Sequence, residues 1–181
     1  RLQDDSASAC AQLSACLTLA EQWAGVSQEP AAVPCMEEAV LSFLRSCEVL
    51  TSDWKQMLEQ AANAPEPENL LAYTPALDQE IRLFTMDMLY RYYLRAAYAE
   101  TPEAEILPLQ MAAFSVCVVL LYSRRLGFHT AEQRLRIWQL FVKEIEYDGA
   151  NLEELEWQLE TNAAFSPAAF RAYFASMGGV Q

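Results

Sequence analysis

Glycine, histidine and basic residues are all scarce in this chain, and each scarcity removes a class of function. The sequence has five glycines and one histidine in 181 residues. It contains no glycine-rich phosphate loop, no dinucleotide fingerprint and no HExxH zinc motif, and it does not indicate a Ser-His-Asp arrangement. The one histidine, His129, follows Gly127 and precedes Thr130, which predicts a residue of a helix connection. An enzyme with this sequence would therefore use unconventional catalytic residues.

The shortage of positive charge limits the possible partners. Twelve Lys and Arg residues against 25 Asp and Glu residues give a net charge of −13, which repels nucleic acid and anionic membrane surfaces. The most apolar run, residues 107–122, is interrupted by Pro108 and Gln110 and is shorter than the roughly 20 residues of a membrane span. We therefore expect no nucleic-acid partner and no membrane association, and we expect this run to form a buried central helix.

The cysteines are odd in number and include no CxxC pair, so neither a disulfide framework nor a zinc site is indicated. They lie in apolar, helix-like stretches, which favours reduced and buried thiols in a cytoplasmic protein. These residues are Cys10, Cys16, Cys35, Cys47 and Cys117. The chain begins with Arg1 and has no leader-like opening, so we interpret it as a piece of a longer cytoplasmic polypeptide rather than a secreted precursor.

Proline and glycine fall where helices should begin and end. A hydroxyl residue precedes a proline at Thr74-Pro75, Thr101-Pro102 and Ser166-Pro167, which is typical of helix starts. Capping-box-like starts follow at Thr130 and Asn151, and Gly127 and Gly149 are expected to end helices. The second half therefore predicts helices near residues 75–100, 102–125, 131–147, 152–161 and 167–176.

Apolar residues in the first half recur at helical spacing over residues 10–24 and 40–47, and a short helix is expected at 51–62. No strand-like alternation competes with this pattern. The predicted fold is all-α, an irregular bundle of about seven to eight helices. Residues 1–63 would form N-terminal helices and 68–181 a C-terminal bundle, joined by the stiff linker 64–67 into one compact domain overall.

Tyrosine and arginine are concentrated in the segment 87–98. Asp87, Arg91 and Arg95 are spaced four apart, so one helix face carries an acid and two guanidinium groups that could hold an anionic ligand. A structural alternative is that the arginine stems cover apolar surface and the heads pair with acids of a neighbouring helix.

Acidic residues are concentrated in the segment 143–148. Glu144 and Asp148 would share a helix face and could attract a cation, but no further ligands stand at metal-binding spacing. We therefore expect a solvated acidic face here rather than a metal site.

Three blocks of the chain have an order and spacing that match a known family. They are 47–54 (CEVLTSDW), 89–98 (LYRYYLRAAY) and 143–148 (KEIEYD) followed by Asn151-Leu152-Glu153. In these blocks, which span most of the chain, the sequence resembles the C-terminal helical part of the flagellin lysine-N-methylase family. That family has Arg, His and Ser where this chain has Lys143, Tyr147 and Asp148.

The resemblance implies a protein that methylates lysine side chains with S-adenosylmethionine, on flagellin or a related protein of a flagellated bacterium. It places any iron-sulfur cluster in a cysteine-rich segment that is absent from this chain. Methyl transfer needs a deprotonated amine held in line with the donor methyl group. An arginine could bind the donor carboxylate and glutamates could attract the substrate ammonium. The substrate- or donor-binding residues expected on this basis are Tyr90, Arg91, Arg95, Glu144 and Glu146.

Three functions remain open at this point. The chain could be the helical part of a lysine methyltransferase that contributes substrate docking or part of the donor site. It could be a non-catalytic helical protein-interaction module that presents a groove to a partner helix. It could also be a structural or regulatory domain.

Overall fold

The computed structural model describes residues 7–25, 36–65, 71–98 and 100–177, and every regular element in those ranges is helical. This confirms the predicted all-α bundle. The elements in chain order are α1 (Ala9–Ala24), α2 (Met36–Ser46), α3 (Ser52–Asn63), α4 (Pro75–Ala97), α5 (Pro102–Leu126), α6 (Ala131–Phe141), the π-helix η1 (Val142–Glu146), α7 (Gly149–Thr161), the 3₁₀ turn η2 (Ala163–Phe165) and α8 (Pro167–Ser176).

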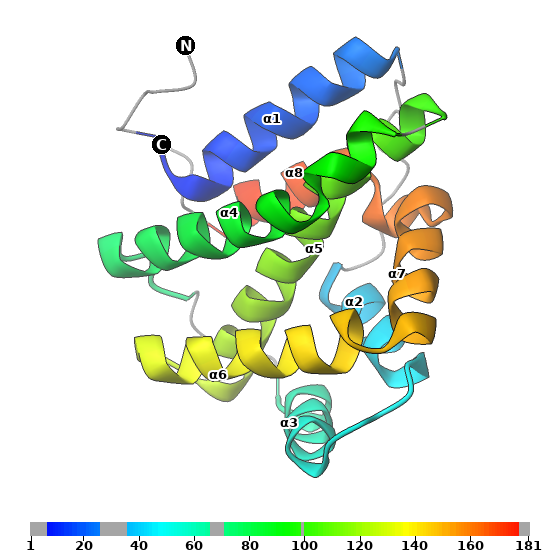
Figure 1. Ribbon diagram of the computed structural model, residues 1–181. Helices are drawn as coiled ribbons and strands as arrows, with labels where there is room; N and C mark the ends of the chain where they lie inside the picture. The colour runs from blue at the N-terminus through cyan, green and yellow to red at the C-terminus, as the bar shows by residue number, and fades with distance from the viewer. Residues whose placement is uncertain (1–6, 26–35, 66–70, 99, 178–181) are drawn as a thin grey trace.

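Helix α5 lies at the centre of the bundle because it has no polar face. It contacts each of the other seven α-helices, and Figure 1 shows it passing behind α4 and between the flanking helices. The helix is long and apolar enough to span a membrane, but 83% of its most apolar window is buried inside the protein. It therefore serves as the core helix of the bundle, as the interrupted apolar run predicted.

The expected cap residues mark several helix ends. The hydroxyls of Thr101 and Ser166 accept hydrogen bonds from the first turns of α5 and α8, and Thr130 and Gln133 form a complete capping box on α6. Gly127 ends α5 with a φ of 65°, a conformation that strains residues with a Cβ.

Two expected boundaries are wrong, and both lie next to Asp148. The Asp148 carboxylate accepts a hydrogen bond from the Asn151 backbone N–H at 2.8 Å, so Asp148 caps α7. Gly149 is consequently the first residue of α7 rather than a helix stop, and Asn151 is a buried residue of its first turn. The helix expected over 131–147 also changes character, because α6 ends at Phe141 and continues as the π-helix η1.

A continuous core links the N-terminal helices to the rest of the chain. Phe43 of α2 packs edge-on against Phe114 of α5 at a centroid distance of 5.4 Å, and Phe114 contacts Phe165 at 5.2 Å. Helix α1 packs on α4, α5 and α8, and buried side chains from Ala9 to Met177 belong to one cluster. The expected linker 64–67 lies partly outside the described residues.

Buried ion pairs tie this core together. Glu37 at the start of α2 is 2% exposed and lies 2.5 Å from Arg124 and 3.1 Å from Arg125, both at the end of α5. Arg134 of α6 makes a two-point pair with Glu80 of α4, at 2.6 and 2.8 Å. These pairs satisfy charges that would otherwise be costly to bury.

Candidate functional site

The structure brings two of the expected site residues, Arg91 and Glu146, into direct contact. The Arg91 guanidinium on α4 lies 2.9 Å from the Glu146 carboxylate at the end of η1 and 3.0 Å from Asp87 one turn earlier on α4. This confirms the structural alternative for Arg91, whose head pairs with an acid of a neighbouring element. A donor carboxylate would have to displace Glu146 to bind this guanidinium.

The Glu146 carboxylate is poorly accessible to a substrate. Only 5% of its side chain is exposed, whereas 36% of the Arg91 side chain is exposed. Burial raises the pKa of Glu146, and the positive charge of Arg91 and a hydrogen bond from Tyr92 oppose that rise. The carboxylate is thus held by groups of α4 and has little surface left for a lysine ammonium.

Glu144, another expected site residue, points to a different part of the protein. Its side chain is fully buried. The carboxylate accepts hydrogen bonds from the Leu50 backbone N–H at 2.7 Å and from the Thr51 hydroxyl. The expectation of a solvated acidic face is therefore wrong, because Glu144 holds the connection between α2 and α3.

Asn151 completes this junction, and nothing in the sequence pattern singled it out for that role. Its side chain accepts a hydrogen bond from the Glu48 N–H at 2.9 Å and donates to the carbonyls of Glu48 and Glu144, each at 2.8 Å. Asp148 caps α7 instead of joining Glu144. The carboxylates of Glu144 and Asp148 thus have separate structural partners.

All three sequence blocks behind the family resemblance meet at η1. The block 47–54 is bonded to Glu144 and Asn151, and the block 89–98 is bonded to Glu146 through Arg91. We call Arg91, Glu144, Glu146 and Asn151 the η1 junction. Its hydrogen bonds hold α4, the α2–α3 connection and α7 together.

The other two expected residues lie on α4. The Tyr90 side chain is 82% exposed, while the Arg95 side chain lies outside the described part of the structure. Tyr90 does not meet Glu144 or Glu146. It belongs to a row of large apolar side chains that face solvent, which we call the α4 outer face. This face consists of Leu83 (60% exposed), Met86 (67%), Tyr90 (82%), Tyr93 (57%), Leu94 (54%) and Tyr98 (84%).

Helix α4 is apolar on its inner face as well. Its inner residues, packed on the core, are Leu77, Ile81, Phe84, Met88 and Tyr92. Figure 1 shows α4 crossing in front of α5, with nothing described covering its near side. Contiguous exposed apolar patches of this kind mark interaction sites.

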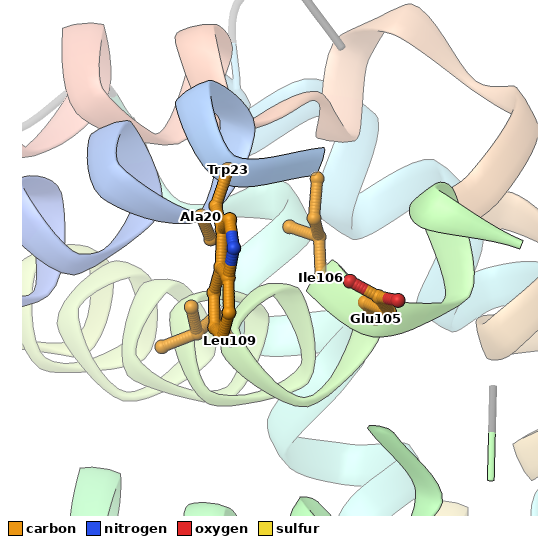
Figure 2. Close-up of a pocket in the computed structure, with 5 residues that line it drawn as sticks. All are labelled: Ala20, Trp23, Glu105, Ile106 and Leu109. Atoms are coloured by element: carbon orange, nitrogen blue, oxygen red, sulfur yellow. The ribbon is translucent and has the colours of Figure 1, made fainter. Parts of the chain in front are cut away.

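Two surface grooves lie away from the η1 junction. One, of about 570 Å³, lies between the end of α1 and the start of α5. Figure 2 shows Trp23 lying alongside Leu109, with Ile106 between the indole and Glu105 in this view. Its described lining offers one carboxylate and otherwise apolar side chains, too few polar groups to orient a reacting substrate. The second, of about 530 Å³, lies between α3 and α6 and contains the Arg136–Asp53 ion pair.

The described residues contain no group of three or more His, Cys, Asp or Glu side chains that could hold a metal ion. Cys10, Cys47 and Cys117 are buried, as predicted, and Cys16 is half-buried. Burial raises the pKa of Cys10 to about 11 and that of Cys47 to about 12, so neither thiol ionises readily at neutral pH. Cys35 lies outside the described residues.

Comparison of the chain with protein-family models, with curated proteins and with solved structures found no match. The α4 outer face and the η1 junction are therefore the features from which a function can be inferred.

Proposed function

We propose that this chain is a helical protein-interaction module whose docking surface is the α4 outer face. The observation that carries the proposal is that α4 has apolar side chains on two faces, and that the described residues cover only the inner one. Burial of apolar surface contributes roughly 25 cal/mol per Å², so covering six large side chains supplies a strong driving force for association. Tyrosine is also among the residues enriched at protein interfaces.

The resemblance to flagellin lysine-N-methylases sets the context of this proposal. In a cytoplasmic methylase acting on flagellin or a related protein, the module would hold proteins together, while S-adenosylmethionine would be bound elsewhere. Support for this division comes from the η1 junction, where Arg91 is already paired with two carboxylates and Glu146 is largely buried.

The proposal is tested by comparing two single variants. Tyr90→Glu places a charge on the α4 outer face, whereas Trp157→Glu does the same at another exposed aromatic residue, 56% exposed on α7. We expect protein association, measured by sedimentation velocity with the chain alone and with purified flagellin, to be lost in Tyr90→Glu and kept in Trp157→Glu. Absence of association in both mixtures, or equal loss in both variants, would overturn the proposal.

Calorimetric titration with S-adenosylmethionine tests whether the donor binds to this chain or elsewhere. We expect no saturable binding by the folded chain. Micromolar binding that is lost in Arg91→Ala would instead assign the donor site to the η1 junction, and the interaction-module proposal would give way to a catalytic one.

A further inference from the structure

The arrangement of side chains along α4 goes beyond docking in general and points to one occupant. We propose that the α4 outer face binds the same face of a second copy of this chain, with the two α4 helices antiparallel about a two-fold axis near Tyr90. This inference rests on the proposed function, because it names the partner of the same surface. Isologous two-fold contacts are the commonest form of protein self-association.

The face has apolar side chains at matching distances on both sides of Tyr90. Met86 lies four residues before Tyr90 and Leu94 lies four residues after it, and both are more than half exposed. An antiparallel copy centred on Tyr90 therefore places Met86 of one chain against Leu94 of the other. The residues spaced four apart form the ridge that packs into the grooves of a facing helix.

The charges beside the face are self-complementary under the same symmetry. Asp87 and Arg91 lie one turn apart along one edge of the face, 41% and 36% exposed in their side chains. In an antiparallel pair, each edge of one helix faces the same edge of the other. Asp87 of each copy is thereby brought close to Arg91 of the other, so two acid–base pairs form across the axis in addition to the pair within each helix.

The exposed area is of the size that a specific interface needs. The three tyrosines are 57–84% exposed and have side chains of roughly 200 Å² each, so they contribute on the order of 400 Å². Leu83, Met86 and Leu94 bring the face to roughly the 800 Å² per partner of a standard interface.

The net charge of −13 opposes self-association in general, but the six exposed side chains that form this face are uncharged. At the edge of the face, Arg91 lies between the carboxylates of Asp87 and the largely buried Glu146 and offsets part of their negative charge. Acidic groups elsewhere on two chains are screened beyond about 8 Å at physiological salt. A dimer through α4 is thus compatible with an acidic protein.

Sedimentation equilibrium of the whole chain over roughly 1–300 µM, the range of weak interfaces, tests the proposal. We expect a monomer–dimer equilibrium that Tyr90→Glu weakens at least about tenfold, because two carboxylates then meet at the axis, and that Tyr90→Phe preserves. Circular dichroism checks that each variant is folded.

A charge reversal at Asp87 distinguishes the proposed Asp87–Arg91 pairing between the two copies from the general repulsion between two acidic chains. Asp87→Lys and the control Glu160→Lys, at an exposed position on α7, reduce the net negative charge equally. We expect Asp87→Lys to weaken the dimer about threefold to tenfold, since the introduced ammonium group would face Arg91 of the other copy. The control should leave dimerisation unchanged or slightly strengthen it. Equal effects of the two variants would overturn the proposed register.

Cross-linking reports the orientation. With a short bis-maleimide, Tyr90→Cys should give covalent dimers above the wild-type background. Leu83→Cys should not, because the two copies of residue 83 lie about 20 Å apart in the antiparallel pair, at 1.5 Å per residue. Strong cross-linking at both positions would indicate parallel helices and refute the two-fold arrangement. A chain that stays monomeric but binds flagellin in a Tyr90-dependent way would refute the second copy as partner and leave the interaction module standing.

Discussion

Replacement of Arg91 by alanine gives the sharpest measurement of what the η1 junction does. The change removes the guanidinium that lies 2.9 Å from Glu146 and leaves a carboxylate whose side chain is only 5% exposed. Breaking a buried ion pair by removing one partner costs about 3–5 kcal/mol. Because 36% of the Arg91 side chain is exposed, water can partly solvate the remaining charge, and we expect a loss of about 2 kcal/mol.

The cost should depend on pH in a defined direction. Burial raises the pKa of Glu146, and Arg91 opposes that rise, so the alanine variant should have a still higher pKa at Glu146. A carboxyl group whose folded pKa exceeds its unfolded value favours folding at low pH, and this contribution is lost as the pH rises through the folded pKa. The free energy of unfolding lost in Arg91→Ala should therefore be larger at pH 8 than near pH 5.

Urea denaturation followed by circular dichroism at both pH values measures this loss, which corresponds to roughly 4–8 °C in melting temperature for a chain of this size. The double variant Arg91→Ala with Glu146→Gln should be more stable than Arg91→Ala alone, because no unpaired charge remains buried. A cost below about 0.5 kcal/mol that is independent of pH and unaffected by Glu146→Gln would refute the structural role of this pair.

Three further outcomes follow from the structure. Glu144→Ala should lower the free energy of unfolding, measured by urea denaturation, by about 3 kcal/mol, because two donors in the α2–α3 connection lose a charged acceptor. Glu144→Gln should lower it by about half as much. A variant as stable as wild type would contradict the role assigned to Glu144. In thermal melts, Gly127→Ala should lower the stability of the fold by about 1 kcal/mol, because Gly127 has a φ of 65°. Gly149 lies in the first turn of α7, and nothing lies within 4 Å of a Cβ added there. Gly149→Ala should therefore be neutral or stabilising by about 0.5 kcal/mol. When the native protein is treated with a maleimide at pH 7, mass spectrometry should find no label on Cys10, Cys47 and Cys117 until urea unfolds the chain. Rapid labelling of these residues in the native protein would contradict their burial.

Local sequence signals predicted most of the helices, because the cap residues act within one turn of their own position. Thr101, Thr130 and Ser166 bond to backbone groups three residues away, so their roles can be read from neighbouring residues. Asn151 has the same chemistry, but two of its side-chain hydrogen bonds join it to Glu48, which is 103 residues away in the sequence. A capping pattern cannot reveal such a contact, and the start of α7 was therefore placed wrongly.

The candidate site shows the same limit. The four-residue spacing of Asp87 and Arg91 predicted a shared helix face, and in the structure the two side chains form an ion pair at 3.0 Å. Whether the acidic side chains of residues 143–148 are buried or exposed depends on which elements pack against η1. The spacing of residues in the sequence does not contain that information. Sequence periodicity does not distinguish the α4 outer face from a core face, because Leu83, Met86, Tyr90 and Leu94 follow the same helical period as core residues.

The strongest sequence motifs and the proposed docking surface are therefore different parts of this protein. The blocks that resemble a methylase family converge on the η1 junction, where their polar groups bond to one another and leave little free surface. Each buried polar group needs its hydrogen-bond partner, so the residues of these blocks are constrained by the fold at least as strongly as by a chemical activity. The α4 outer face is under no such internal constraint, yet it keeps six large apolar side chains in contact with water. No described part of the chain covers this face, and we therefore propose that it binds a partner.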